Sequence, residues 1–211
     1  MSTVNSEFFK NFSIFKNLSS EELHDVAGIL TKKIYQTGEI IIEQDELSSS
    51  AFIIESGGVK VYRLSVNGEQ ISLAILGPGE IVGELSLLDS EPRSAFVEAI
   101  QESVIFTLSR DSLLRILSSQ PNTAINLLKT LAARLRQADE RVEDILSRNL
   151  SERTWKMLLA LVNYFPNKNI ALSQEELAEI IGATRSRVTE VLNKLQAEGK
   201  ITLSHRKIQL I

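Results

Sequence analysis

The chain has 211 residues, of which 43% are apolar and 24% charged, and its formal net charge is -4; these values are typical of a soluble globular protein and exclude a wholly disordered chain. It contains no cysteine, which excludes disulfides, thiolate zinc sites, cysteine-held iron–sulfur clusters and a cysteine nucleophile. Its two histidines, His24 and His205, lie far apart in sequence, so we expect no haem site and no bound metal.

The N-terminal region predicts a short helix and no signal peptide. The first ten residues, MSTVNSEFFK, lack a basic start and a long apolar core. Ser19 and Glu22 have the spacing of a capping box, and Leu23, Val26 and Leu30 follow on one helical face. No apolar run of the chain approaches the span of a bilayer, so we expect a cytoplasmic protein without a membrane partner.

From residue 32 to residue 108 the chain predicts short strands separated by turns. Asn67-Gly68 between two such strands is a strong hairpin signal, because both residues tolerate a positive φ. Many short strands at close spacing predict an antiparallel barrel or sandwich. The expected strands are 39–42, 51–54, 59–62, 71–76, 96–99 and 104–108.

A long helix is predicted in the middle of the chain. Ser109 can cap a helix over residues 110–118 that Pro121 ends, and neither proline nor glycine occurs from residue 122 to residue 165. Apolar residues recur there at steps of three and four, the spacing of a coiled coil. We expect a dimer seam, and the alternative is a helix lying along its own domain. The stripe consists of Leu128, Leu131, Leu135, Ala138, Val142 and Ile145.

The last third of the chain is basic. Residues 1–147 hold 13 Lys+Arg and 21 Asp+Glu, a balance of -8, whereas residues 148–211 hold 10 and 6, a balance of +4. A basic segment behind an acidic body is typical of a module that binds a polyanion, although many small basic domains bind nothing charged.

Within this segment we predict a winged helix-turn-helix that reads double-stranded DNA. After a helix over 151–165, a second capping box at Ser173 and Glu176 starts the next helix, Gly182 occupies the turn, and another helix covers 185–198. The alternative is a helical hairpin with a solvated face. The side chains expected on DNA, including those of the terminal hairpin, are Thr184, Arg185, Ser186, Arg187, Thr189, Glu190, Asn193, Lys194, Arg206 and Lys207.

Three of these side chains have expected roles. Arg185 is suited to guanine, because its fork matches the O6 and N7 acceptors. Glu190 can accept from a cytosine amine or orient Arg185 or Arg187, and both roles stay open. Lys207 is expected on a phosphate.

The segment from Gly83 to Ala95 predicts a loop that binds phosphate. Gly83 lets the backbone approach a ligand, and the short helical turn after it can present N–H groups to an anion. Arg93 supplies a charged planar fork, Ser94 a neutral donor, and Glu84 an acceptor for a sugar hydroxyl. On spacing alone, a barrel loop with a surface Glu84–Arg93 salt bridge fits equally well.

This segment resembles the phosphate-binding cassette of cyclic-nucleotide-binding domains, and the chain from about Phe8 to Ile211 resembles the CRP/FNR family of bacterial transcription regulators. Gly38-Glu39, the run 52–57, the run 77–80, the long helix and the winged helix-turn-helix all take part in the resemblance. It implies an α+β fold. The implied parts are a jelly-roll-like, cyclic-nucleotide-binding β-roll at residues 1–121, a dimerisation helix at 122–148 and a winged helix-turn-helix at 149–211.

The resemblance also implies a site and partners. By it, Glu84 binds a ribose 2′-hydroxyl and Arg93 a cyclic phosphate. The implied effector is a cyclic nucleotide, with cyclic AMP as the first candidate. The implied partners are DNA, a second copy of the chain and RNA polymerase. The other residues implied in the pocket are Gly83, Leu85, Ser94 and Ala95.

Two departures from the family pattern concern specificity. Cyclic AMP receptors carry a Thr-Ser pair on the central helix, where this chain has Ala138 and Asp139; Asp139 can accept from a base amine or be a solvated flank. Ser186 replaces a glutamate and Glu190 an arginine of the best-known recognition helix, which implies a different operator. Cyclic GMP, a cyclic dinucleotide, 2-oxoglutarate or no effector are the alternatives.

Two other classes of function compete with a DNA-binding regulator. An enzyme is disfavoured, because two scattered histidines compose no Ser/His/Asp set and the chain has no Walker loop, so we expect no catalytic residue. An adaptor that uses only the β-roll would show no sequence-specific DNA binding.

Overall fold

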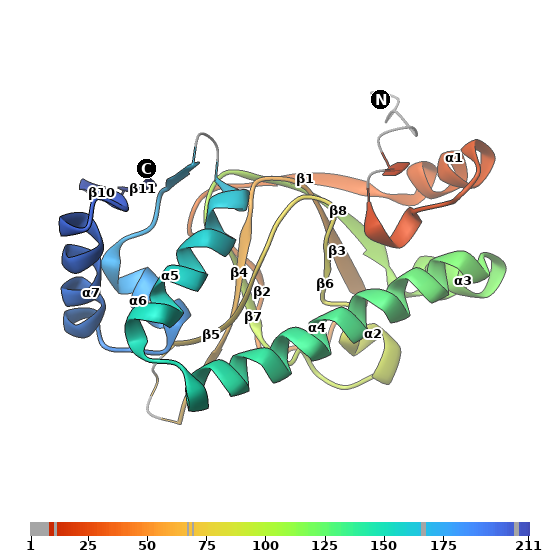
Figure 1. Ribbon diagram of the computed structural model, residues 1–211. Coiled ribbons are helices and arrows are strands. Elements are labelled where there is room, and N and C mark those ends of the chain that lie inside the picture. Colours follow the sequence, from red (N-terminus) through yellow and green to blue (C-terminus); the bar gives the residue numbers. More distant parts are fainter. Residues whose placement is uncertain (1–8, 11, 67, 69, 166–167, 205–206) are drawn as a thin grey trace. The chain divides into compact units, whose positions relative to one another are not determined.

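The structure is a computed structural model that describes residues 9–10, 12–66, 68, 70–165, 168–204 and 207–211 (Figure 1). The chain divides into two compact units. The first comprises the chain up to Val61 together with Leu76–Gln137, and the second comprises Tyr62–Ile75 together with Ala138–Ile211. Among the described residues, no helix combines the length and the apolar character needed to cross a membrane.

Two four-stranded sheets form the β-roll, as expected from the many short strands. Their strand orders are not consecutive in sequence, which is the mark of a jelly-roll-like crossover. The first sheet has the order β1 (Thr31–Tyr35), β8 (Ser103–Ser109), β3 (Ser50–Ser56), β6 (Ile81–Val82). The second has the order β2 (Ile40–Ile42), β7 (Phe96–Ala99), β4 (Val59–Leu64), β5 (Gln70–Leu76).

Strands β1 and β6 were not expected from the sequence. Both lie at the edges of their sheet, where one side of a strand needs no partner strand. Four of the five residues of β1 are exposed, so its two lysines fit an edge, and β6 has only two residues. Neither strand therefore carries the apolar alternation that predicts a strand.

The core of the first unit is built from alternate strand residues and three N-terminal phenylalanines. Phe9, Phe12 and Phe15 are at most 1% exposed. Their rings contact each other and the ring of Phe106 on β8, with centroids 5.1–6.5 Å apart. Ile53 of β3 pairs with Phe106 and is fully buried, so strand pairing and core packing reinforce each other.

The helices of the first unit begin where the sequence predicts caps. Ser19 and Glu22 make the expected reciprocal capping box at the start of α1 (Ser20–Ile29). Ser109 caps α3 (Arg110–Ser119) by accepting from the N–H of Ser112 at 3.2 Å. Among the described residues, this unit also contains η2 (Ser13–Phe15), α2 (Leu85–Asp89) and the first part of α4 (Pro121–Ser147).

The second unit contains the end of α4, the hairpin residues 62–75 and the C-terminal elements. Arg141 of α4 donates to the carbonyl of Leu73 on β5, which ties the hairpin to this helix. The predicted helix 151–165 is shorter in the structure, because α5 (Leu150–Leu161) passes into a 3-10 turn, η3 (Val162–Tyr164).

The C-terminal elements form a helix-turn-helix followed by a small sheet. Helices α6 (Gln174–Ile181) and α7 (Arg185–Ala197) are joined at Gly182. The predicted terminal hairpin is part of a three-stranded sheet, because an unexpected strand pairs with its last strand. The order is β10 (Ile201–Ser204), β11 (Lys207–Leu210), β9 (Asn169–Ile170). His205 and Arg206 of the hairpin, and Asn67 of the other one, lie outside the described residues.

Candidate ligand-binding and DNA-binding sites

The cassette segment, residues 83–95, is built around a glycine that no other residue can replace without strain. Gly83 has a φ of +77°, and a Cβ built on it would lie 2.6 Å from Arg93 Nη1 and 2.8 Å from Ile42 Cδ1. The sequence therefore needs glycine here for its backbone angle and for the close approach of the arginine. The predicted helical turn after it is α2, which begins at Leu85.

Arg93 is a buried cation held by neutral oxygens. It is 2% exposed, and within the described part of the chain its guanidinium donates to the carbonyls of Gly83 and Ser50 and to the hydroxyls of Ser48, at 2.6 Å, and Ser86, at 3.4 Å. Burial lowers the pKa of Arg93 from its ordinary value. The negative charges of two nearby glutamates oppose that decrease, and the effect of Glu46 is larger than that of Glu84.

Glu84 is also buried, and its partner is not Arg93. It is 1% exposed, and its Oε1 accepts from Nη1 of Arg134 on α4 at 2.8 Å. Arg134 also donates to the carbonyl of Ile81. The surface Glu84–Arg93 salt bridge considered from the sequence is therefore wrong, because each residue is buried with other partners.

Arg134 is a residue of the candidate site that the sequence did not indicate. Its partner Glu84 lies 50 positions earlier, and an arginine beside an apolar helical stripe is normally solvated. Arg134 lies one helical turn before Ala138, which with Asp139 departs from the family pattern. Within the sequence, this position was the only indication that Arg134 belongs to the candidate site.

The remaining cassette residues differ in exposure. Ala95 is buried, Leu85 is 44% exposed and Ser94 is exposed. The backbone around Arg93 is fixed to the preceding loop, because the Arg93 N–H donates to the Glu46 carbonyl at 2.9 Å and the Asp45 N–H donates to the Arg93 carbonyl at 2.8 Å. The backbone of Arg93 is thus held on both its N–H and its carbonyl, independently of the side chain.

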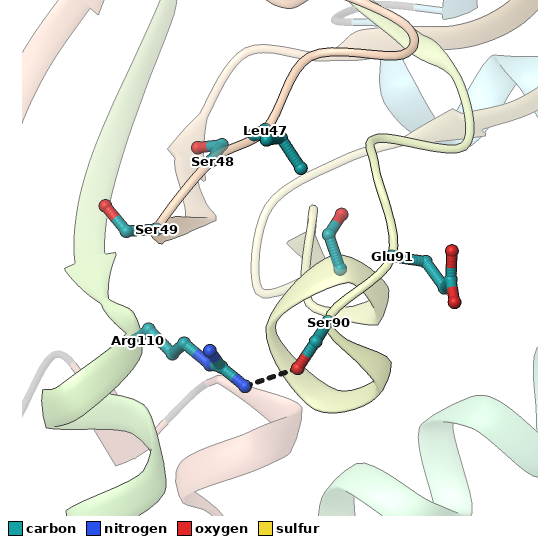
Figure 2. Close-up of a pocket in the computed structure, with 7 residues that line it drawn as sticks. Leu47, Ser48, Ser49, Ser90, Glu91 and Arg110 are labelled. Carbon is teal, nitrogen blue, oxygen red and sulfur yellow. Dashed lines mark hydrogen bonds between the residues drawn. The ribbon is translucent and has the colours of Figure 1, made fainter.

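A pocket of about 430 Å³ lies beside the cassette segment (Figure 2). Four serine hydroxyls, one leucine and two opposite charges line it, and Arg110 reaches Ser90 across it. Its lining residues are Leu47, Ser48, Ser49, Ser86, Ser90, Glu91 and Arg110.

The stripe on α4 is exposed to solvent over most of its length. Leu128, Leu135, Val142 and Ile145 are 59–65% exposed. Leu131 differs, because it is half-buried and packs against the core of the first unit. Two further apolar residues, Ile125 and Leu146, extend the exposed face at its ends. Ala138 and Asp139 are exposed on the same helix.

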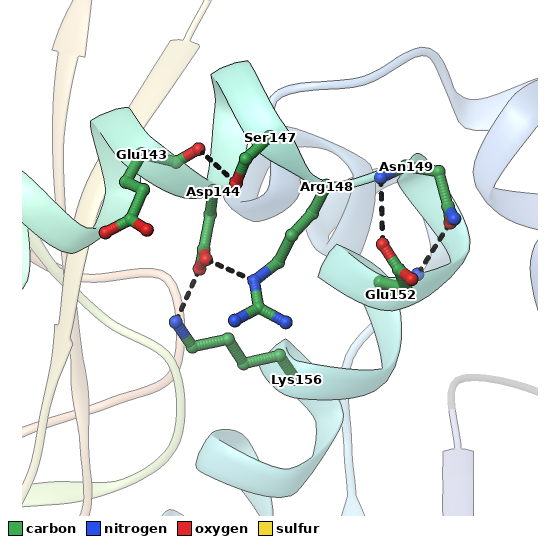
Figure 3. Close-up of polar contacts among 7 residues, drawn as sticks. All are labelled: Glu143, Asp144, Ser147, Arg148, Asn149, Glu152 and Lys156. Atoms are coloured by element: carbon green, nitrogen blue, oxygen red, sulfur yellow. Dashed lines mark hydrogen bonds and ion pairs between the residues drawn. The ribbon is translucent and has the colours of Figure 1, made fainter.

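A cluster of ion pairs links the end of α4 to α5 (Figure 3). The Asp144 carboxylate accepts from Arg148 Nε at 2.6 Å and from Lys156 Nζ at 2.5 Å. The hydrogen bond from Lys156, and after it that from Arg148, holds the pKa of Asp144 below its ordinary value. Asn149 and Glu152 form a reciprocal capping box at the start of α5, so two N–H groups of this first turn have side-chain acceptors.

The helix-turn-helix has the expected buried junction and exposed face. Gly182 adopts a φ of +71° as the C-cap of α6, and Ala178 is 1% exposed, as required where two helices approach closely. Val188 and Leu192 of α7 are fully buried. The predicted readers that are exposed on or next to α7 are Thr184, Arg185, Ser186, Arg187, Glu190, Asn193 and Lys194.

Two of the predicted readers already have partners. The Thr189 hydroxyl is half-buried and lies 2.6 Å from Oε1 of Gln174, so it links α7 to α6. Arg185 Nε lies 3.8 Å from Glu175 Oε2, and both members of this pair are more than 60% exposed. An ion pair of Arg185 with Glu190 was one of the roles left open by the sequence. Lys207 is exposed at the start of β11.

Within the described residues, no group of three or more histidine and carboxylate side chains lies together in a way that could hold a metal ion. The polar groups gathered at the cassette segment are suited to a ligand that carries its own negative charge and hydroxyls. The exposed polar side chains on α7 are suited to a partner surface that presents hydrogen-bond acceptors and donors, as the edges of DNA bases do.

Comparisons with known proteins match both regions. Residues 32–120 match the family model of the cyclic nucleotide-binding domain, and residues 152–211 match that of the Crp-like helix-turn-helix domain. The cyclic AMP receptor protein of Thermus thermophilus is 31% identical over 201 residues, which cover 95% of this chain and 93% of that protein.

Two solved structures are similar in fold. The crystal structure of the Thermus thermophilus catabolite activator protein has 31% identity and a TM-score of 0.57, and the match covers 94% of this chain and 93% of that one. A c-di-GMP responsive global regulator of Xanthomonas campestris has a TM-score of 0.78 at 19% identity, with 91% and 99% covered.

Proposed function

Since this chain belongs to the CRP/FNR family of transcription regulators, whose members are not enzymes, we propose that it is a homodimer gated by a cyclic nucleotide. The effector binds in the β-roll, and the dimer binds a palindromic operator through two copies of α7. In this proposal residues 1–121 sense the effector, 122–148 dimerise and 149–211 bind double-stranded DNA. The protein acts in the cytoplasm, with RNA polymerase as a further partner.

The observation that carries the effector proposal is the buried Arg93. Its guanidinium is 2% exposed and donates to neutral oxygens, so it lacks a carboxylate in hydrogen-bond contact within the described residues. A buried cation requires a countercharge, and a cyclic phosphate supplies one. The Ser94 hydroxyl and the Ala95 N–H would add neutral donors beside it.

Glu84 is suited to the ribose of the same ligand. Arg134 engages its Oε1 and thereby fixes the carboxylate in one orientation. In the proposed complex, Oε2 accepts from the 2′-hydroxyl. The backbone of Gly83 and Leu85 would complete the pocket, and the missing Cβ at Gly83 is what lets the Arg93 guanidinium lie against this backbone.

Cyclic AMP is the first candidate for the effector, because the 31% identical relative is named a cyclic AMP receptor protein. A cyclic dinucleotide is the second, because Ala138 and Asp139 depart from the Thr-Ser pair of cyclic AMP receptors and a regulator of the same fold is described as c-di-GMP responsive. In the proposal, Asp139 contacts the base.

Calorimetry with cyclic AMP, cyclic GMP, c-di-GMP and 2-oxoglutarate tests this assignment. We expect cyclic AMP to bind most tightly to the wild type and to give no detectable heat with Arg93→Leu. The control is Arg115→Leu, because Arg115 is an exposed arginine on α3. An affinity that survives Arg93→Leu would show that the effector binds elsewhere.

The exposed stripe on α4 supports the homodimer. Leu128, Leu135, Val142 and Ile145 are 59–65% exposed on one chain, and apolar faces of this length are normally covered. The double variant Leu135→Glu/Val142→Glu should be monomeric by light scattering, since a seam would bury four unpaired charges. The control Arg136→Glu/Glu140→Lys changes exposed polar residues of the same helix that are outside the stripe, and it should stay dimeric.

The exposed face of α7 supports the operator proposal. Arg185 is the candidate for a guanine contact, and two copies of α7 should meet major grooves about 34 Å apart. A randomised-site selection should return a palindrome for the wild type and a relaxed sequence at one position of each half-site for Arg185→Ala. Identical operators for both proteins would exclude α7 as the reader.

A further inference from the structure

The C-terminal end of α2 is a weak point of the cassette segment. Helix α2 has only five residues, and a helix of this length is not stable by itself. It ends at Ser90, which has a φ of +66°, a left-handed conformation that is unfavourable for serine. The last carbonyls of a helix also need donors from outside the helix.

Arg110 supplies these donors from the first position of α3. Its Nε donates to the Leu87 carbonyl at 3.2 Å, and its Nη2 donates to the Ser90 hydroxyl at 2.6 Å. A cation at the C-terminal end of a helix also interacts favourably with the helix dipole. One side chain thus satisfies a carbonyl at the helix end and holds the residue that carries the strained angle.

The pocket beside the cassette segment shows why this side chain matters. The space of about 430 Å³ separates part of α2 from the loop at Leu47–Ser49, and Arg110 spans it (Figure 2). The lining carries one cation and one carboxylate, Glu91, so it has no net charge to attract an ion. On this side of α2, Arg110 therefore stabilises the position of the helix through its hydrogen bonds to Leu87 and Ser90.

The two ends of α2 are mechanically connected. Glu84, the candidate ribose ligand, is its N-cap, and Ser86 in its first turn contacts Arg93. Arg110 itself is fixed, because its own N–H donates to the Ser49 carbonyl at 2.7 Å and its neighbour Ser109 caps α3. A displacement of α2 at its C-terminal end would move Glu84 and the Ser86 hydroxyl that contacts Arg93.

We propose that Arg110 is a positioning residue of the effector site, which holds α2 in the conformation that presents Glu84 and Arg93 to the cyclic nucleotide. This inference rests on the proposed function. Pre-organisation of this kind raises affinity by lowering the ordering cost of binding. Loss of a charge-assisted hydrogen bond in such a role corresponds to an effect of about tenfold.

The test combines affinity with local hydrogen exchange. Arg110→Met removes both hydrogen bonds and keeps the aliphatic chain, and Arg115→Met is the matched control on the same helix. We expect Arg110→Met to bind cyclic AMP about tenfold more weakly. In the effector-free protein, the amides of residues 85–92 should exchange faster, whereas those of β3 and β8 should not change.

Two further variants separate positioning from general stability. Arg110→Lys keeps the charge and one donor and should recover most of the affinity, and Ser90→Ala removes one acceptor and should give a smaller loss. If Arg110→Met does not fold, these two variants test the positioning role of Arg110 in its place. Their melting temperatures should equal that of the wild type while their affinities differ as stated.

The outcomes distinguish this inference from the proposed function. Wild-type protein that binds none of the nucleotides would contradict the proposed function, and the exchange of residues 85–92 would still test Arg110. Wild-type affinity together with unchanged exchange of these amides in Arg110→Met would overturn the inference.

Discussion

The cassette segment and helix α7 present the side chains of the two candidate sites in opposite ways. Glu84 and Arg93 are 1–2% exposed and are held by internal hydrogen bonds before any ligand arrives. On α7, Arg185 and Glu190 are exposed, and the ion pair of Arg185 with Glu175 spans 3.8 Å at the surface. A small enclosed ligand needs groups that are already desolvated and oriented, whereas a large partner surface can be met by free side chains.

The difference predicts that function and stability are coupled in the cassette segment and separable on α7. Substitutions at the first site remove internal partners as well as ligand contacts. Substitutions of exposed residues at the second, such as Glu190, should remove contacts to the proposed DNA partner with little effect on the fold. The following variants test this contrast in matched pairs, from the largest expected effect to the smallest.

Two glycines with nearly the same backbone angle should respond very differently to alanine. In Gly83→Ala, a φ of +77° and a Cβ within 2.8 Å of two side-chain atoms should lower the unfolding free energy by about 2–4 kcal/mol and abolish nucleotide binding. In Gly182→Ala, a φ of +71° with open space around the Cβ should cost about 1 kcal/mol. Chemical denaturation and calorimetry measure both, and equal losses would contradict the contrast.

Two isosteric glutamate substitutions form the next pair. Glu84→Gln replaces the charge that pairs with Arg134, so we expect a loss of about 1–3 kcal/mol of stability and weaker nucleotide binding. Glu190→Gln changes an exposed residue and should leave the melting temperature unchanged while altering operator preference in a site selection. A destabilised Glu190→Gln protein would show that α7 uses this carboxylate internally.

Lys207 should give an effect that is smaller and independent of sequence. Lys207→Met removes an exposed charge at the start of β11, so affinity should fall equally for specific and random DNA. The slope of log K against log salt should become shallower by about two units per dimer, because each copy of Lys207 contributes about 0.9. A loss confined to one operator would mean that Lys207 reads a base.

The smallest effect should come from Asp144 and should depend on pH. Because its ion pairs hold its pKa below the ordinary value, the stabilisation is present above the unfolded pKa and is lost as the pH falls through the folded one. Asp144→Asn should therefore melt below the wild type at pH 7, and the difference should begin to shrink near pH 4 and vanish only when the pH falls below the lowered folded pKa. Glu143→Gln, which removes a carboxylate outside these ion pairs, is the control (Figure 3).

Local patterns predicted much of the fold. The capping boxes at Ser19 and Ser173, the turn at Gly182 and the start of α7 at Arg185 were all found from residues within one or two helical turns. Such signals depend on short-range hydrogen bonds and backbone angles, which a sequence displays directly. The edge strand β1 was missed because its exposed lysines hide the strand pattern.

The candidate site was only partly predictable for the same reason. Glu84 and Arg93 lie in one short segment, so the spacing of the cassette segment points to them. Arg134 reaches Glu84 across 50 positions and Arg110 reaches Ser90 across 20, and neither arginine lies in a motif. Contacts of this kind are set by the packing of distant elements, which local patterns do not encode.

Helix α4 runs without a break through 27 residues, from Pro121 to Ser147 (Figure 1). An uninterrupted helix transmits rotation as well as distance, so one residue inserted after Gln137 would turn everything beyond it by about 100° and advance it by about 1.5 Å. An insertion of seven residues would return the face to within about 20° of its original direction. We therefore expect the protein to tolerate an insertion of seven residues in this helix, which is about two turns, better than an insertion of one residue.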